Sequence, residues 1–261
     1  MTKVVFHADD FGICEPVTEG IINAFSGIVT SASIMVPCAG FEHAVRCYSQ
    51  HSDILDIGLH FTLTTGGISQ PYSPLSPDVP TLVDKKGVFN INLEKVAASV
   101  SSQDIEKELR TQMHHVIKSG IRITHIDSHM FVGNHPKVAE AMAKVAWDFR
   151  VPVVLTKEHT MEKKLIQMGF PIFNSIVAVQ SLQQLKIHLS SLKGGLHYVI
   201  FHPAIRTPTL EKLLPNTWER RVDDYNICTE GIISELINQL NVHPVGMRQL
   251  MNELRNSYKW I

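Results

Sequence analysis

Short apolar segments alternate with longer amphipathic segments along most of the chain. Continuous apolar runs predict strands, and apolar residues three or four positions apart predict helices. In 105–119, for example, apolar residues recur at 105, 109, 113 and 116, and Gly120 follows as a helix stop. The expected strands are 3–8, 29–36, 56–63, 122–129, 151–155 and 196–202, and the expected helices are 16–26, 41–50, 105–119, 135–149, 229–240 and 245–254.

This alternation predicts an α/β fold with a parallel sheet, and the number of strands favours a distorted, TIM-barrel-like α/β barrel. The length of 261 residues is common for a barrel that forms one domain, so we expect a single domain over 1–261. There is no internal repeat and no linker-like segment. The irregular stretch 64–90 contains four prolines and directly follows a predicted strand. We expect it to overhang the substrate cleft, because long loops in compact domains are often functional.

Composition narrows the class of protein. The formal net charge is −1, so no global field attracts nucleic acid or an anionic membrane, and we expect neither partner. The basic pairs Lys85-Lys86 and Arg220-Arg221 are too short to change this and are interpreted as solvated surface. The four cysteines have no metal-finger or disulfide-framework spacing, and no signal or membrane segment is recognisable. We therefore expect a cytoplasmic protein.

Polar residues with catalytic potential follow the predicted strands. One such residue could be a turn, a helix cap or a satisfied core histidine. All of them fall at the carboxyl ends of strands, where α/β barrels place their active sites, and this coincidence predicts a single site. The candidates are Asp9 and Asp10, His60, the group His125, Asp127 and His129, and His202.

These residue types fit a hydrolytic metal centre, which needs about three protein ligands and an open position. Successive side chains of a strand diverge, so one aspartate of the pair would bind the ion while the other accepts a proton from water. The residues at 125, 127 and 129 share one strand face. His129 lies nearest the strand end and is the better ligand. Asp127 could fix the tautomer of a liganding imidazole, and the deeper His125 would be supportive.

The ordered motifs ADDFG (8–12), GIVTSAS (27–33), GLHFTLT (58–64), THIDSH (124–129) and HP (202–203) resemble the YdjC-like carbohydrate deacetylase family. The resemblance implies a TIM-barrel-like fold, a bound Mg²⁺, a homodimer and hydrolysis of N-acetyl groups on small acetylated oligosaccharides of the chitooligosaccharide type. By motif position it implies Asp10, His60 and His129 as metal ligands, Asp9 as the base and His202 as the acid. No substrate-binding residue is assigned.

The chain departs from this pattern at two places. The family commonly continues DSH as DSHxHVH, whereas this chain reads DSHMFVGNH, so any role of the later histidine is absent or moved to His135. The family's His-Pro-Gly is His-Pro-Ala here. The identity of the metal also stays open, because two imidazoles and one carboxylate suit Zn²⁺ or another transition metal better than the Mg²⁺ that the resemblance implies.

Two other classes of function are compatible with these residues. A metal-dependent phosphoesterase or sugar isomerase could use the same scaffold and ligands, since fold does not fix function. A phosphate site would favour a glycine-rich turn or an arginine cluster near the metal. A non-catalytic carbohydrate-binding protein could also keep the site, but it would need no proton donor opposite a base.

Overall fold

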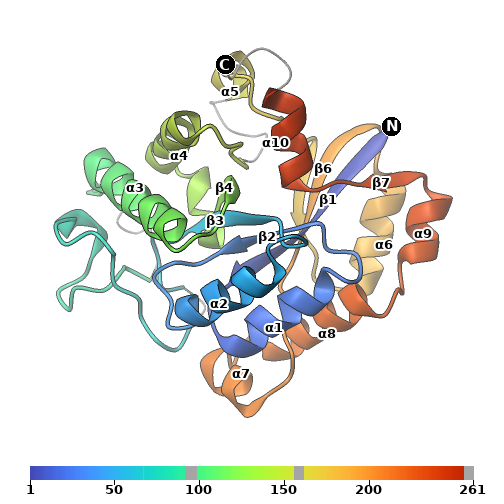
Figure 1. The fold of residues 1–261 in the computed structure, drawn as a ribbon, viewed down its shortest axis with the longest axis horizontal. Helices are drawn as coiled ribbons and strands as arrows, with labels where there is room; N and C mark the ends of the chain where they lie inside the picture. The colour runs from blue at the N-terminus through green and yellow to red at the C-terminus, as the bar shows by residue number, and fades with distance from the viewer. Residues whose placement is uncertain (67, 92–98, 156–161, 256–261) are drawn as a thin grey trace.

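The long strand β1 (Thr2–Phe11) lies in the middle of a parallel sheet (Figure 1). The computed structural model of the chain describes residues 1–66, 68–91, 99–155 and 162–255. On one side of β1 lie β2 (Ser31–Ile34), β3 (Ile57–Phe61) and β4 (Ile123–Ser128), in that order, and on the other lie β6 (Gly195–Phe201) and β5 (Ser175–Ala178). The short β7 (Val242–Pro244) pairs with the start of β1.

The sheet curves so strongly that side chains from distant strands meet inside it. Tyr198 of β6 donates a hydrogen bond of 3.3 Å from its hydroxyl to Oδ2 of Asp127 on β4, although three strands separate β6 from β4 in the sheet order. Every named strand pair is parallel, and helices surround the sheet. The predicted distorted α/β barrel is therefore confirmed.

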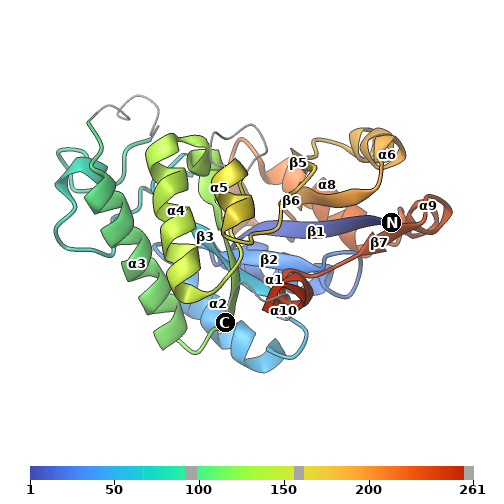
Figure 2. The same ribbon diagram turned by 90° about the horizontal axis from the view of Figure 1, so that it is seen from above.

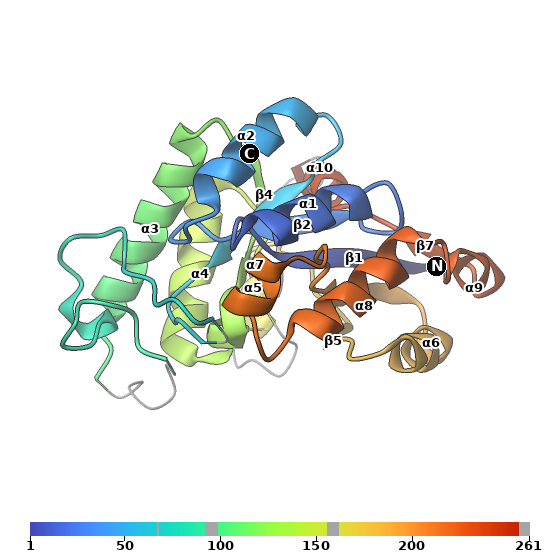
Figure 3. The ribbon, with the colours of Figure 1, turned by 90° about the horizontal axis from the view of Figure 1, so that it is seen from below.

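The helices cover the outside of the sheet. Figures 1 and 3 place α1 between α2 and α8, and Figure 2 places α3 beside α4. The helix bounds are α1 Glu15–Ala24, α2 Phe41–His51, α3 Ser102–Lys118, α4 Pro136–Phe149, α5 Glu162–Gln167, α6 Leu182–Ser191, α7 Pro208–Leu213, α8 Trp218–Thr229, α9 Ser234–Gln239 and α10 Met247–Arg255, with short 3₁₀ turns η1 at Pro80–Leu82 and η2 at His129–Asn134.

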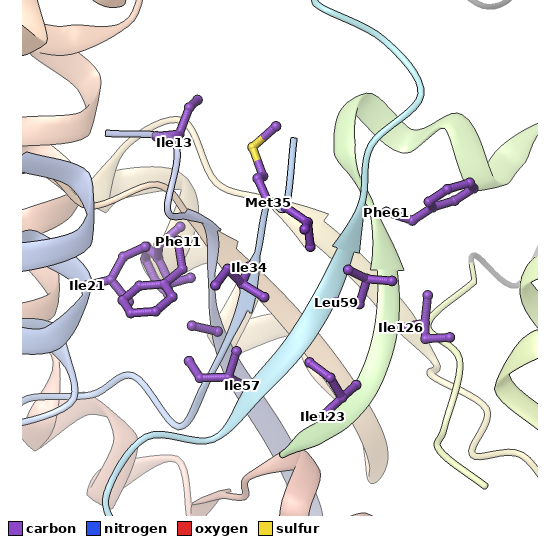
Figure 4. Packing of buried hydrophobic residues seen from close by; sticks show 14 of the residues in the cluster. Phe11, Ile13, Ile21, Ile34, Met35, Ile57, Leu59, Phe61, Ile123 and Ile126 are labelled. Atoms are coloured by element: carbon purple, nitrogen blue, oxygen red, sulfur yellow. The ribbon is translucent and has the colours of Figure 1, made fainter. Parts of the chain in front are cut away.

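The core lies between the sheet and this layer of helices (Figure 4). Ile34, Ile57 and Leu59 come from adjacent strands, and Ile21 comes from α1. All four side chains are completely buried. Burying apolar area of this kind contributes about 25 cal/mol per Å², so the core holds the carboxyl ends of the strands in fixed positions.

Some expected elements differ from those observed. Segment 151–155 makes only one isolated bridge, from Val153 to Ile126, in place of a strand, because Pro152 has no N–H to donate. The helix expected over 229–240 forms only in its second half, as α9 from Ser234, because Gly231 has a φ of 69° that is incompatible with a helix. The pattern missed β5, β7, α5, α6 and α7, and it gave no helix over α8.

Of the described residues of the stretch 64–90, those near its start border the candidate site. Gly66 and Ile68 line the cavity that Asp9, Asp10 and His60 also line, whereas residue 67 lies outside the described residues. Further along, the Ser76 N–H donates to Oε2 of Glu108 at 2.8 Å, so this part packs on α3 and away from the cavity. The expectation of a loop over the cleft is thus correct for its first residues and wrong for the rest that is described.

Candidate active site and metal centre

The end of β1 is a bulge. Pairing with β2 shifts register between Ala8 and Phe11, and Asp10 and Gly12 have φ values of 74° and 89°. A left-handed conformation costs a residue with a side chain about 1–3 kcal/mol, and such strain is typical of functional sites. Both carboxylates approach Nε2 of His60, at 3.9 Å from Asp9 Oδ2 and 3.4 Å from Asp10 Oδ1. Asp9 and Asp10 nevertheless belong to different groups of neighbouring donor atoms, Asp10 with His60 and His129, and Asp9 with His60 and Asp127.

The three expected metal ligands come together from three strand ends. Asp10 Oδ1 lies 3.4 Å from Nε2 of His60 and 3.3 Å from Nδ1 of His129. All three residues are buried. Asp10 Oδ1 accepts no hydrogen bond from the part of the chain that the structure describes. A buried carboxylate oxygen between two imidazole nitrogens fits a cation-binding position.

The remaining ring nitrogens of the two histidines are held by other groups. His60 Nδ1 lies 2.9 Å from Asp127 Oδ1, and His129 Nε2 lies 3.1 Å from the Gly66 carbonyl oxygen. A carboxylate and a carbonyl oxygen only accept hydrogen bonds, so His60 Nδ1 and His129 Nε2 carry the hydrogens. The other ring nitrogens, His60 Nε2 and His129 Nδ1, face Asp10. Burial lowers the pKa of His60, but Asp9 and Asp127 outweigh it, and the pKa is raised well above its usual value. The surrounding carboxylates thus favour positive charge at this point.

His7 is a site residue that the sequence interpretation missed. It lies on β1 and is fully buried, with Nε2 at 3.2 Å from Asp9 Oδ1 and 3.0 Å from Asp127 Oδ2. Burial lowers the pKa of His7, but its hydrogen bonds to Asp127 and Asp9 outweigh burial and raise it. His7 therefore links the proposed base to the carboxylate that holds His60. The period of β1 placed it on the same face as Asp9, which was the available signal.

His125 lies deeper, as expected for a supportive residue. Its ring packs edge-on against His7 with centroids 5.2 Å apart, and its Nε2 lies 3.8 Å from Asp127 Oδ2. A side chain at Gly58 would place its Cβ only 2.3 Å from the His125 ring, so glycine is required there. Burial lowers the pKa of His125, and the ring is neutral at neutral pH.

Two arginines of α8 reach the site, so the interpretation of Arg220-Arg221 as solvated surface is wrong. Arg221 is buried and donates from Nη2 to Asp10 Oδ2 at 2.6 Å. Burial raises the pKa of Asp10, but the charge of Arg221 and the two histidines lower it by more. The pKa of Asp10 is therefore well below its usual value. Arg220 donates to His202 Nδ1 at 3.2 Å and to Gln180 Oε1 at 2.8 Å.

The other basic pair, Lys85-Lys86, is exposed to solvent, as the sequence predicted.

His202 approaches Asp9 from the end of β6. Its Nε2 lies 3.6 Å from Asp9 Oδ2, and its backbone N–H donates to Asp224 Oδ2 at 2.8 Å. A guanidinium can only donate, so Nδ1 accepts from Arg220 and the hydrogen of the neutral ring is on Nε2. Burial is the main cause that lowers the pKa of His202 to about 4. Asp10 and Asp9 raise this pKa, whereas Arg221 and Arg220 lower it.

Asp9, Asp10, His60, His129 and His202 open into one cavity of about 380 Å³. Its other walls are mixed: apolar side chains include Ile68, Val154, Leu155, Ile176 and Ile200, and polar ones include Asn134, Gln180, Thr217 and Arg220.

The cavity also has an apolar lip where the chain departs from the DSHxHVH pattern. Met130 and Phe131 both have φ of 53° and are 58% and 45% exposed. They line the cavity, whereas His135 is at the start of α4 and does not. No histidine therefore replaces the missing one among the described residues of the cavity wall.

The chain is similar to known proteins over most of its length. The sequence profile of the YdjC-like protein family matches residues 3–239. The chain belongs to the YdjC-like family. A carbohydrate deacetylase of Clostridium beijerinckii is 38% identical over 253 residues, which cover 95% of this chain and 100% of that one. A carbohydrate deacetylase of Brevibacillus brevis is 41% identical over 152 residues, 58% of each chain.

Among solved structures, a proposed cellobiose-phosphate cleavage protein of Enterococcus faecalis has a TM-score of 0.83 and 26% identity, covering 95% of this chain and 98% of that one. The predicted family is thus confirmed. No helix in the described part of the chain has the length and hydropathy needed to cross a membrane.

Proposed function

We propose that this chain is a carbohydrate deacetylase that uses one divalent cation to hydrolyse N-acetyl groups of small oligosaccharides and releases acetate. The enzyme class follows from membership of the YdjC-like family and from the full-length similarity to the Clostridium beijerinckii deacetylase. The observation that carries the metal dependence is the buried Asp10 Oδ1, which faces His60 and His129 without a hydrogen bond.

Asp10, His60 and His129 would hold the cation. When bound, a divalent ion polarises the acetyl carbonyl and makes water more acidic. The resemblance favours Mg²⁺, and the two imidazoles favour Zn²⁺ or another transition metal. Arg221 balances the charge of Asp10 on the side away from the histidines, so that one oxygen stays available for the ion.

Asp9 is the proposed base. Its Oδ2 lies between His60 and His202, at 3.9 and 3.6 Å, while Oδ1 faces His7 Nε2 at 3.2 Å. Amide hydrolysis also needs a proton for the departing nitrogen. Because the pKa of His202 is lowered to about 4, its ring is neutral at neutral pH. We infer that the neutral Nε2–H of His202 orients the acetamide and that Asp9, once protonated by water, returns the proton.

The cavity suits a sugar. Met130 and Phe131 offer apolar surface for the C–H faces of a pyranose ring, and Gln180 and Arg220 offer donors for its oxygens. Arg220 Nε is buried and has no hydrogen-bond partner among the described residues. The Enterococcus faecalis protein is named for a phosphorylated disaccharide. Chitooligosaccharides with and without phosphate are therefore the substrates to compare.

The phosphoesterase alternative would gain from an arginine cluster, and Arg220 and Arg221 do lie at the cavity. Each has a partner at the site, Arg221 in Asp10 and Arg220 in His202 and Gln180, while Arg221 Nη1 and Arg220 Nε have no hydrogen-bond partner among the described residues. These contacts hold the guanidinium groups against the metal ligand and the histidine, and the remaining donors fit either class of substrate, so the arginines do not favour a phosphoesterase.

The deciding experiment measures acetate release from N-acetylglucosamine oligomers after chelation and after return of Mg²⁺ or Zn²⁺. We expect activity to disappear with chelation and to return with one ion. The His129→Ala variant should keep the fold and lose metal and activity. Activity that survives full chelation would overturn the proposal.

The resemblance also implies a homodimer, and we further propose a cytoplasmic location. Light scattering tests the oligomeric state, and cell fractionation tests the location.

A further inference from the structure

A second group of metal-binding side chains lies outside the active site, between α1 and α2, which lie side by side (Figure 1). Glu19 comes from α1, and His43 and Cys47 come from one face of α2, one turn apart. Glu19 Oε1 lies 3.0 Å from His43 Nε2 and 3.6 Å from Cys47 Sγ, and the Cys47 Sγ to His43 Nε2 distance is 3.4 Å. The three donor atoms therefore form a small triangle.

This triangle has nearly the size of one face of a zinc coordination tetrahedron. With bonds of about 2.0–2.2 Å to nitrogen and oxygen and about 2.3 Å to sulfur, ligand atoms lie about 3.4 Å apart for nitrogen and oxygen and about 3.6 Å apart for pairs with sulfur. The observed separations reach these values if the atoms move by no more than about 0.4 Å. We propose that Glu19, His43 and Cys47 bind a Zn²⁺ ion that links α1 to α2.

Burial and donor chemistry support this assignment. Cys47 is buried, whereas the side chains of His43 and Glu19 are 24% and 41% exposed, so an ion can enter from solvent and keep a water as its fourth ligand. A sulfur, an imidazole nitrogen and a carboxylate oxygen together select Zn²⁺ or a similar transition metal over Mg²⁺. The site is separate from the active site, whose ligands include no sulfur. Its function is structural, because the ion would join two helices that flank the end of β1.

The test uses Co²⁺ as a spectroscopic substitute for Zn²⁺. It is carried out on the full chain with His129→Ala, which removes a ligand of the proposed active-site ion. A thiolate-to-cobalt absorption band should appear at one equivalent of Co²⁺. Cys47→Ser should abolish the band, and Glu19→Gln should weaken Co²⁺ binding by at least the 10–100-fold that loss of even an outer-shell partner causes. Glu15→Gln, the same change one turn earlier on α1, should leave binding unchanged.

A second measurement distinguishes loss of the metal site from loss of the fold. Zn²⁺ should raise the melting temperature of the His129→Ala chain but not that of its Cys47→Ser derivative, since an ion that binds only the folded state stabilises it. Circular dichroism checks that each variant is folded. Absence of the band, its persistence in Cys47→Ser, or its appearance only at millimolar Co²⁺ would each overturn the zinc site and leave a hydrogen-bonded trio. None of these results affects the deacetylase proposal.

Discussion

Arg221 Nη2 donates a hydrogen bond of 2.6 Å to Asp10 Oδ2, although the two residues are 211 positions apart. Both side chains are nearly inaccessible, at 7% and 2% exposure. A carboxylate this deeply buried needs a compensating charge. The guanidinium supplies it on one side, and the proposed cation would supply it on the other. Helix α8 is therefore part of the candidate active site as well as part of the outer layer.

Replacing Arg221 with Met should destabilise the protein by about 3–5 kcal/mol in the presence of a chelator, because it leaves Asp10 buried without its partner. Saturating metal should reduce this loss, since the ion compensates Asp10. Urea unfolding with and without metal measures both values. Arg110→Met, which removes a partly exposed pair with Glu106 and Asp148, should cost no more than about 1 kcal/mol. Equal losses in the two variants would contradict the role of Arg221.

His7→Leu should lower kcat about 10–100-fold, the range typical of outer-shell partners, with KM and metal content unchanged. The reason is that Asp9 and Asp127 would then face each other without the donor that now lies 3.2 and 3.0 Å from them. His7→Gln retains an N–H donor and should recover part of the loss. Steady-state kinetics beside metal analysis separates the outcomes. A Gln variant no better than the Leu variant would argue that His7 only fills space.

Asp9→Asn should lose about 10²–10⁴-fold in turnover while it keeps its metal, as expected when a general base is removed. Asp10→Asn, the same change at the next residue, should lose both metal and turnover. Asp9 also lies within ligand distance of His60 and Asp127, so metal content is the critical measurement. Loss of metal in Asp9→Asn would make Asp9 a ligand and not the base.

Much of the fold could be predicted from the sequence because strands buried on both faces appear as apolar runs. The runs at β1, β3, β4 and β6 were found with small boundary errors. Helix α8 was not, because it carries a mixed sequence, WERRVDDYNICT, in which buried Arg221 and Asp224 interrupt the apolar stripe. Charges that are buried against partners from distant segments look like surface when read locally.

The same limit explains which site residues were missed. Residues next to a strand end, such as His60 and His129, can be recognised as candidate site residues from their position in the sequence. His7 lies inside a strand and Arg220 lies on a helix, so their roles depend on neighbours that only the folded sheet supplies. The bulge at Asp9 and Asp10 is also invisible in the sequence, because Asp10 adopts its φ of 74° without being glycine.

The pH dependence of catalysis should distinguish two roles of His202. Its pKa is lowered to about 4, so the neutral ring predominates above that pH, and at saturating metal and substrate this residue should cause no loss of kcat between about pH 5 and 7. If an imidazolium were required as the acid, kcat would instead fall about tenfold per unit above pH 4. Arg220→Met removes a cation that lowers this pKa and should move the acid limb to higher pH.

Two substitutions at His202 distinguish a hydrogen-bond donor from a proton donor. His202→Asn keeps an N–H donor and should retain more activity than His202→Ala, for which we expect a loss of about 10²–10⁴-fold. Metal content should be unchanged in both variants, because His202 is not among the proposed ligands. If Asn and Ala are equally inactive and the profile of the parent enzyme falls steadily above pH 4, His202 donates a proton from its charged form, and Asp9 serves only as the base.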